Sequence, residues 1–254
     1  MKKAKWENTA VIIPVFNARE HLDELISRIL KFFPKEQIFA INDASTDNSK
    51  EICKKYDLNL IDFPVNSGKG FALQKGFQAA ILTNFDFAFV IDSDLQHEPE
   101  EFPNFLKLQN EFDYDLIIGK RDFSYDQMPF LRVFSNSITS GIVSFFTGQK
   151  IEDSQSGFRL YNLNIIKDFK FRTRRYQFET EIILKFSEKN AKIGFVPIKT
   201  IYNDEVSHIS HLRDIIYFLD VIFYERFLMK SSRKYRKESR RKKRRKKIIN
   251  SLRS

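Results

Sequence analysis

The chain has 254 residues, of which 42% are hydrophobic and 30% are charged, so it can bury a substantial core and is not a disordered protein. Its one cysteine, Cys53, excludes an internal disulfide bond and favours a reducing, intracellular setting. No stretch approaches the roughly 20 apolar residues that span a bilayer, and the apolar run at 11–16 is too short for a signal peptide. We therefore expect a soluble or peripheral protein.

The positive charge is confined to one end of the chain. Residues 230–254 hold 14 of the 43 Lys and Arg residues and a single acid, which leaves the preceding 229 residues with a net charge of −3. We predict one folded domain over residues 1–229 and a basic tail over residues 230–254.

Short apolar runs alternate with amphipathic segments in the first half of the chain. The run at 87–91 is entirely apolar, which favours a central strand covered on both faces. The alternation predicts an α/β fold with a doubly wound, mostly parallel, Rossmann-like sheet flanked by helices. The expected strands are 11–16, 38–41, 58–63, 87–91 and 116–118, and the expected helices are 18–33, 46–56, 69–82 and 99–112.

The pattern is less regular in the second half. Helices are predicted at residues 131–147, 178–187 and 209–229, and a strand at 193–198. The last helix runs into the basic tail, which we expect to be a helical appendage of the domain.

Polar residues follow several of the predicted strands. Parallel strands end at one edge of a sheet, and ligands bind beyond their carboxyl ends, so we expect these residues to converge on one rim. The polar clusters are Asn17, Asn42-Asp43, Asp92-Ser93-Asp94 and Lys120-Arg121.

Asp92 and Asp94 are two residues apart, so an extended backbone places both carboxylates on one side. Two neighbouring carboxylates repel unless a proton or a cation lies between them. Oxygen ligands favour Mg²⁺ or Mn²⁺, and such an ion would neutralise a diphosphate leaving group. A solvated loop is the alternative, but the position after an apolar strand favours metal binding.

The segment Asn66-Ser67-Gly68-Lys69-Gly70 opens the predicted helix at 69–82. Glycines allow close backbone approach, and the N–H groups at a helix start favour anions. The spacing of a Walker loop is absent. The segment is therefore either a phosphate-binding loop or an ordinary turn into a helix.

Six segments together carry a family resemblance, and they are Val11–Asn17, Ile41–Ser49, Asn66–Gly70, Asp92–Glu100, Gly119–Arg121 and Asp153–Arg159. In their order and spacing they resemble the family 2 glycosyltransferases, which have the GT-A fold. The resemblance covers about residues 9–210 and is to the branch that contains dolichyl- and polyprenyl-phosphate sugar synthases.

The resemblance implies a donor site for a nucleotide sugar. Asp94 is the expected direct ligand of a bound Mg²⁺ or Mn²⁺. The implied members are Pro14, Asn17 and Asp43 for the base and ribose, Asp92, Asp94 and Gln96 for the diphosphate and metal, and Lys69 and Arg159 for the rest of the donor.

The resemblance also implies catalytic and acceptor residues. Asp94, Arg121 and Asp153 are the expected catalytic residues, with Arg121 near the acceptor or a phosphate and Asp153 in the wall of the sugar pocket. Arg132 and Ser135 match the positions that hold the acceptor phosphate in lipid-phosphate synthases.

Two departures from the family pattern affect these expectations. Asn42-Asp43-Ala44-Ser45 replaces the usual Asp-Asp-Gly-Ser, so both UDP and GDP stay open as the donor nucleotide. Residues 205–208 replace a later Gly-x-Ser-Lys type motif. Their last residue, His208, is a candidate ligand of metal or phosphate, and a structural histidine is the alternative.

The implied function is the inverting transfer of a hexose from a nucleotide sugar to a polyprenyl-phosphate-type lipid. A phosphate acceptor is already an anion at pH 7, so catalysis would rest on positioning and charge stabilisation. An alternative keeps the donor but uses a hydroxyl of a glycan or glycolipid in cell-envelope polysaccharide synthesis, with Asp153 as the general base.

The basic tail admits three interpretations. It is a solvated charge cluster, a nucleic-acid arm on a non-catalytic protein, or a contact with anionic lipid head groups. Intact Asp92, Asp94 and Arg121 argue against an inactive transferase, and glycine-rich signals of a nucleotidyltransferase are missing at the first strand. We expect a cytoplasmic enzyme, peripheral at the inner face of the membrane, with no nucleic-acid partner.

Overall fold

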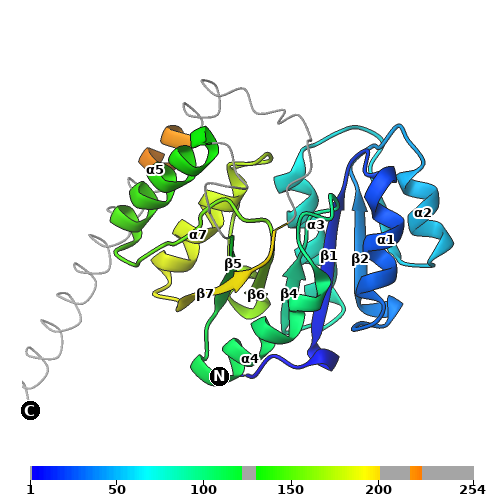
Figure 1. Cartoon of the computed structure of the whole chain (residues 1–254), viewed down its shortest axis with the longest axis horizontal. Helices are drawn as coiled ribbons and strands as arrows, with labels where there is room; N and C mark the ends of the chain where they lie inside the picture. Colours follow the sequence, from blue (N-terminus) through cyan, green and yellow to red (C-terminus); the bar gives the residue numbers. More distant parts are fainter. Residues whose placement is uncertain (1, 122–129, 201–217, 225–254) are drawn as a thin grey trace, which may run out of the picture.

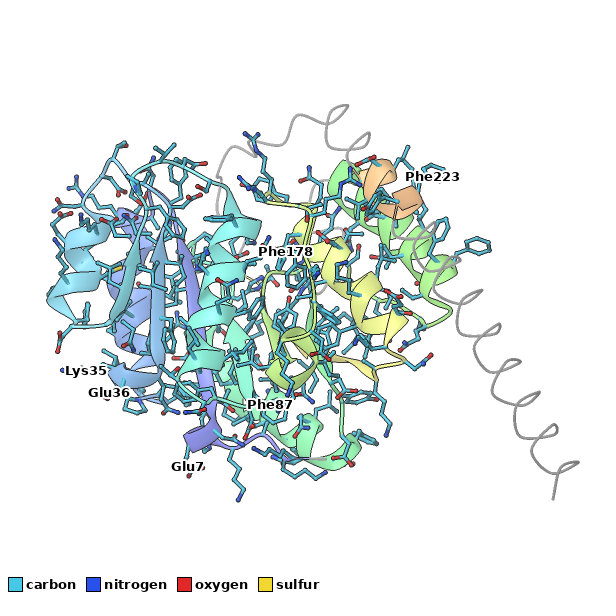
Figure 2. All side chains as sticks on the ribbon, turned by 180° about the vertical axis from the view of Figure 1, so that it is seen from behind. Glu7, Lys35, Glu36, Phe87, Phe178 and Phe223 are labelled. Atoms are coloured by element: carbon cyan, nitrogen blue, oxygen red, sulfur yellow. The ribbon has the colours of Figure 1, made fainter. Side chains whose placement is uncertain are left out.

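The computed structural model describes residues 2–121, 130–200 and 218–224, and for residues 130–135 it describes the backbone only. One β-sheet runs through the molecule, with helices packed on both of its faces (Figure 1). Helices α1 and α2 lie near one end of the sheet, and α5 and α7 lie near the other, as the views from the front and from behind both show (Figures 1 and 2).

Within the described residues, seven strands form one mixed sheet in the order β3-β2-β1-β4-β6-β5-β7. Neighbouring strands are parallel, except that β6 runs antiparallel to both β4 and β5. The mostly parallel α/β sheet is therefore confirmed. The strands are β1 (Thr9–Val15), β2 (Ile38–Asn42), β3 (Asn59–Asp62), β4 (Phe87–Val90), β5 (Leu116–Arg121), β6 (Arg159–Asn162) and β7 (Ile193–Ile198).

Strand β6 is absent from the expected elements. It has four residues and carries a polar side chain at each end, Arg159 and Asn162, so it lacks an apolar run. Arg159 pairs with Val90 of β4 and with Ile118 of β5. Because β6 runs antiparallel, its first residue lies at the edge where the parallel strands end, and the turn that precedes it reaches the same edge.

The helices match the expected positions with small shifts at their ends, except that the short helix α6 is absent from the expected elements. The N-terminal shift of α2 has a local cause, since Asp47 accepts hydrogen bonds from the Ser49 backbone and hydroxyl and so forms a turn ahead of the helix. The helices are α1 (Arg19–Ile29), α2 (Ser49–Lys55), α3 (Lys69–Leu82), α4 (Phe102–Phe112), α5 (Phe130–Thr147), α6 (Leu163–Ile166) and α7 (Phe178–Glu188).

The expected helix at 209–229 lies mostly outside the described residues, and its described part, 218–224, is helical. Across the ranges that the structure describes, no helix combines the length and the apolar character needed to cross a bilayer.

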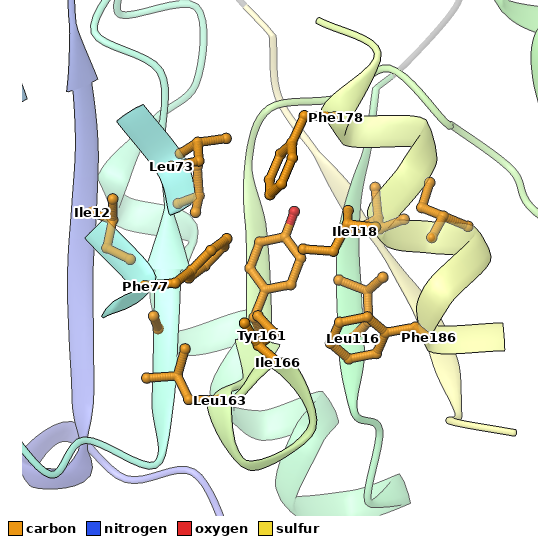
Figure 3. Close-up of a cluster of buried hydrophobic side chains, with 14 of the residues drawn as sticks. Ile12, Leu73, Phe77, Leu116, Ile118, Tyr161, Leu163, Ile166, Phe178 and Phe186 are labelled. Carbon is orange, nitrogen blue, oxygen red and sulfur yellow. The ribbon is translucent and has the colours of Figure 1, made fainter. Parts of the chain in front are cut away.

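Two apolar layers hold the helices on the sheet. On one face, Phe77 of α3 and Phe186 of α7 pack around Tyr161 of β6, whose ring centroid lies 5.0 Å and 6.0 Å from theirs (Figure 3). On the other face, α1 and α4 pack through fully buried residues such as Leu25 and Phe102. Each such side chain contributes about 1.5–3 kcal/mol by leaving water. The layers fix the ends of the strands, where the polar clusters lie.

Candidate active site

The turn after β4 presents the paired aspartates. Leu95 has a left-handed backbone conformation (φ 56°), which reverses the chain directly after Asp94. The Gln96 backbone N–H then donates to Asp94 Oδ1 at 3.0 Å. The left-handed conformation costs a residue other than glycine about 1 kcal/mol, so the surrounding structure must impose this turn. Asp92 and Asp94 therefore sit in a defined turn at the carboxyl edge.

Asp92 forms an ion pair with Lys69. The Lys69 Nζ atom lies 2.7 Å from Asp92 Oδ1 and donates to Oδ2 at 2.9 Å. Burial alone would raise the pKa of Asp92, but the ammonium group outweighs burial and lowers it. Lys69 also donates to Glu179 Oε1 at 2.6 Å, so one ammonium serves two carboxylates.

The surroundings of Asp92 are compatible with a small cation. Its Oδ1 atom contacts the Lys69 ammonium but accepts no well-aligned hydrogen bond from any described residue. Gly157 faces it so closely that a Cβ atom there would lie 2.0 Å from Asp92 Oδ2. Within the described ranges, no three His, Cys, Asp or Glu side chains form a preformed metal cluster. The two aspartates and Gln96 supply the oxygen ligands that Mg²⁺ or Mn²⁺ prefers, with water and phosphate needed for the other positions, and a metal site made of them stays a prediction.

A second ion pair lies at the end of β5. Arg121 Nε donates to Asp153 Oδ2 at 2.8 Å, and its Nη2 donates to Oδ1 at 3.0 Å. Asp153 is fully buried and also accepts from the backbone N–H groups of Gln155 and Ser156. Burial would raise the pKa of Asp153, but Arg121 and these N–H groups hold it below the usual value. At neutral pH this carboxylate is charged and its oxygens are occupied.

The two ion pairs share one neighbour. His97 is buried, and burial, the largest effect, lowers its pKa to about 4. Charged groups of both ion pairs also act on that pKa, since the carboxylates of Asp92 and Asp153 raise it and the cations of Arg121 and Lys69 lower it. The ends of β4 and β5 are thus brought together at one edge, as the polar clusters predict.

Arg159 shapes the turn between these ion pairs. Its guanidinium is fully buried and donates to the backbone carbonyls of Ser154, Ser156 and Glu179 at 2.8, 2.6 and 3.0 Å. These bonds tie the 153–157 turn to the start of α7. The structure thus gives Arg159 an internal role, and its assignment to the donor stays a prediction.

Asp43 organises the loop before α3. Its two carboxylate oxygens accept from the backbone N–H groups of Ser67 and Gly68, each at 2.7 Å. Gly68 has a φ of +94°, and a Cβ atom there would lie 2.5 Å from the Arg174 carbonyl oxygen. The glycines predict that another group approaches this backbone closely, and one does. That group is the chain's own segment 174–178 and not a bound ligand.

Pro14 and Asn17 lie at the end of β1. Pro14 is buried, and a proline fits this central strand because pairing with β4 ends at Ile12. Asn17 is exposed, and its Oδ1 atom accepts from the Thr46 backbone N–H at 2.8 Å. Both residues are therefore at the expected edge, and their contacts with a base or ribose stay predictions.

Three predicted site residues lie outside the described part of the site. The side chains of Arg132 and Ser135 are not described, although their backbone belongs to α5, and His208 falls in the undescribed range 201–217. The opposite case is Glu179, which contacts Lys69 and belongs to no motif singled out in the sequence.

Comparison with known proteins assigns the family. The model of the family described as "Glycosyl transferase family 2" matches residues 10–174. This chain belongs to glycosyl transferase family 2.

Individual relatives agree with this assignment. An uncharacterized protein from Methanocaldococcus jannaschii is 33% identical over 215 residues, which cover 78% of this chain and 91% of that protein. The UDP-N-acetylglucosamine–dolichyl-phosphate N-acetylglucosaminyltransferase from Methanococcus voltae is 25% identical over 216 residues, covering 76% of this chain and 86% of that enzyme.

A solved structure supports the fold. Glucosyl-3-phosphoglycerate synthase from Mycobacterium tuberculosis, in complex with Mn²⁺, UDP and phosphoglyceric acid, superimposes with a TM-score of 0.68 at 14% identity. The match covers 86% of this chain and 78% of that one. The expected GT-A fold is confirmed.

Proposed function

We propose that this chain is an inverting, metal-dependent hexosyltransferase that moves a sugar from a UDP- or GDP-linked donor to a polyprenyl-phosphate-type lipid. The observation that carries the proposal is the presence of two ion pairs, Lys69–Asp92 and Arg121–Asp153, beside Asp94 at the carboxyl edge. Family membership supports it, as does the dolichyl-phosphate acceptor in the name of the Methanococcus voltae relative.

On the donor side, Asp94, Asp92 and Gln96 would hold Mg²⁺ or Mn²⁺, which when bound would neutralise charge on the leaving diphosphate. The Mn²⁺ and UDP in the Mycobacterium tuberculosis structure support this part of the proposal. Lys69 supplies a fixed positive charge beside Asp92, so the site is partly neutralised before any ion binds. The base and ribose are assigned to Pro14 and Asn17 at the end of β1 and to Asp43 directly after β2.

On the acceptor side, Arg121 is proposed to bind the acceptor phosphate, with Arg132 and Ser135 of α5 as further contacts. An oxygen of that phosphate attacks the anomeric carbon from the face opposite the diphosphate. The bond from the anomeric carbon to the diphosphate oxygen breaks, and the nucleoside diphosphate leaves with the bonding electron pair. The configuration at the anomeric carbon inverts, and the transition state has oxocarbenium character. Because the acceptor phosphate is already ionised, no proton has to be removed from it.

The state of Asp153 favours a phosphate acceptor over a hydroxyl. A hydroxyl acceptor needs a general base with a pKa near the working pH. Asp153, the predicted base, has a lowered pKa, and both of its oxygens accept hydrogen bonds from Arg121. It is a weak base in this setting, whereas an ionised phosphate needs none. Transfer to a glycan or glycolipid hydroxyl stays the second candidate.

The test is an assay of the full-length protein with Mn²⁺ and a panel of UDP- and GDP-hexoses. Polyprenyl phosphate and a neutral polyprenol serve as paired acceptors. We expect sugar transfer to the phosphate and none to the alcohol. A thermal-shift screen with UDP, GDP and Mn²⁺ identifies the nucleotide beforehand, because a ligand at one hundred times its Kd stabilises the fold by about 2.7 kcal/mol. Transfer to hydroxyl acceptors only would favour the second candidate.

We further propose that the tail at 230–254 binds anionic lipid head groups and so keeps the enzyme at the inner face of the membrane. Each Lys or Arg near such a surface contributes about 1 kcal/mol, and the effect weakens with salt. A chain ending at Met229 is expected to lose sedimentation with phosphatidylserine vesicles and to keep transfer to a detergent-soluble short-chain acceptor. Unchanged vesicle binding would exclude this role of the tail.

A further inference from the structure

Three charged side chains with little solvent exposure form a row at the candidate donor site. Lys69 lies between Asp92 and Glu179, with its Nζ atom 2.7 Å from Asp92 Oδ1 and 2.6 Å from Glu179 Oε1. The side chains of Lys69, Asp92 and Glu179 are only 18%, 22% and 11% exposed. One ammonium faces two carboxylates, so the row carries a formal net charge of −1.

The backbone at Glu179 is held in place by contacts with neighbouring elements. Glu179 is in the first turn of α7, and its backbone carbonyl accepts from Arg159 at 3.0 Å. A Cβ atom at Gly70 would lie 2.6 Å from Cβ of Phe178, so the starts of α3 and α7 are in direct contact. Figure 3 shows Phe178 of α7 beside Leu73 of α3. Both helix starts therefore present their charged side chains to each other at a set distance.

From this geometry we infer that Glu179 is a positioning residue of the donor site and acts through Lys69. It holds the ammonium in place and takes up part of its charge, so that Asp92 keeps negative charge for a metal–diphosphate complex. Without Glu179, Lys69 would neutralise Asp92 alone, and the net charge of the row would rise from −1 to zero. This inference rests on the proposed function, since it concerns how the same donor site is tuned.

The inference predicts a specific effect of Glu179→Gln, which keeps the size of the side chain and an oxygen acceptor but removes the charge. We expect the affinity for Mn²⁺ together with UDP or GDP, measured by calorimetry, to fall about tenfold, within the usual range for coupled charged neighbours. Glu179→Asp, which keeps the charge, is expected to restore part of the loss.

A double-mutant cycle with Lys69→Gln separates action through Lys69 from a general effect on the helix. If Glu179 acts through the ammonium, Glu179→Gln has no further effect in the Lys69→Gln background. The matched control is Glu181→Gln. Glu181 is also buried on α7, but it accepts from the backbone N–H groups of Arg172 and Thr173. Its substitution should lower the Tm and change nucleotide affinity by the same factor in both Lys69 backgrounds.

The outcomes are distinguishable. Equal effects of Glu179→Gln in both Lys69 backgrounds, or wild-type affinity in Glu179→Gln, would overturn the inference and leave the proposed function standing. If the double variant does not fold, the comparison of Glu179→Asp with Glu179→Gln decides, and equal losses in the two would overturn the inference. Failure of the wild-type chain to bind either nucleotide with Mn²⁺ would instead refute the proposed function.

Discussion

Arg121 and Asp153 form a two-pronged ion pair, with Nε 2.8 Å from Oδ2 and Nη2 3.0 Å from Oδ1. Arg121 ends β5, and Asp153 belongs to the turn that leads into β6. Asp153 is fully buried, so its charge depends on this one guanidinium and on backbone N–H groups. The pair therefore fixes the direction in which Arg121 presents its charge at the carboxyl edge.

Asp153→Asn tests this pair. The change leaves Arg121 without its buried counter-charge, and breaking a buried pair in this way destabilises proteins by about 3–5 kcal/mol. We expect a loss of that order in urea unfolding, together with a fall of at least a hundredfold in kcat/KM, because the guanidinium is no longer held in place.

The matched control is Glu152→Gln. Glu152 precedes Asp153 in the chain and pairs with Lys120, which precedes Arg121. This pair is more exposed, because the Glu152 side chain is 26% exposed and that of Lys120 is 42% exposed. Exposed pairs contribute about 1 kcal/mol or less, so stability and activity should stay near wild type. Equal losses in the two variants would mean that the Arg121–Asp153 pair has no special role.

Asp94→Asn tests the metal assignment. The amide removes the negative charge while Gln96 N–H can still find an oxygen acceptor at this turn. We expect the Mn²⁺ dependence of turnover to disappear and kcat/KM to fall by about a hundred- to a thousandfold, the size seen when one group that stabilises developing negative charge is removed. Turnover and Mn²⁺ dependence measured in parallel would decide, and wild-type values of both would exclude Asp94 as a ligand.

Gly157→Ala tests the close contact beside Asp92. A Cβ atom at position 157 would lie 2.0 Å from Asp92 Oδ2, so the carboxylate must move. We expect a loss of about 1–3 kcal/mol in stability, the usual range for overpacking, and weaker Mn²⁺ binding.

Gly141→Ala, in α5, is the control for this substitution, because a Cβ atom there would meet no atom of the described residues within 4 Å beyond its own helix backbone. Alanine in a helix is favoured over glycine by about 0.5–1 kcal/mol, so this variant should be as stable as wild type or slightly more so. If Gly157→Ala behaved like Gly141→Ala in stability and Mn²⁺ binding, the claim that Asp92 leaves no room for a side chain at position 157 would be wrong.

Cys53 gives a pH dependence of stability. Burial raises the pKa of its thiol from 9.0 to about 12. The folded chain thus keeps a proton that the unfolded chain loses, so this contribution is complete below pH 9 and is lost as the pH rises from 9 towards 12. At pH 10 the loss is about 1.4 kcal/mol relative to neutral pH.

Urea unfolding of wild type and Cys53→Ala at pH 7 and pH 10 measures this term. The alanine variant should be less stable at pH 7, because it leaves a small cavity, but it should lose about 1.4 kcal/mol less than wild type between the two pH values. Identical pH dependence of the two proteins would show that the thiol ionises as readily in the folded chain.

The sheet and most helices follow from local patterns in the sequence. The run 87–91 is apolar throughout because β4 is covered on both faces, and the amphipathic segments between strands become α1, α3 and α4. Strand β6 could not be predicted in the same way. Its pairing with β4 and β5 is set by long-range contacts, and polar Arg159 interrupts any apolar pattern.

The candidate site also contains residues that local sequence patterns predict and residues that only long-range contacts bring in. Asp92, Asp94 and Arg121 are predictable because each follows a predicted strand, and Asp153 is predictable because it belongs to a segment that carries the family resemblance. Glu179 is not, because its contact with Lys69 spans 110 residues and arises only when the starts of α3 and α7 meet. The hydrogen bonds of Arg159 within the protein could not be predicted from the sequence for the same reason, since one of them joins β6 to α7.

The central claim is that the carboxyl edge beside Asp94 binds the diphosphate of a nucleotide sugar through a divalent cation. A crystal structure of the full chain with Mn²⁺ and the nucleotide chosen by thermal shift tests it most directly. The account predicts an anomalous manganese peak about 2.0–2.3 Å from an Asp94 carboxylate oxygen, in contact with the diphosphate. A well-ordered nucleotide bound elsewhere, with no manganese at Asp94, would contradict it.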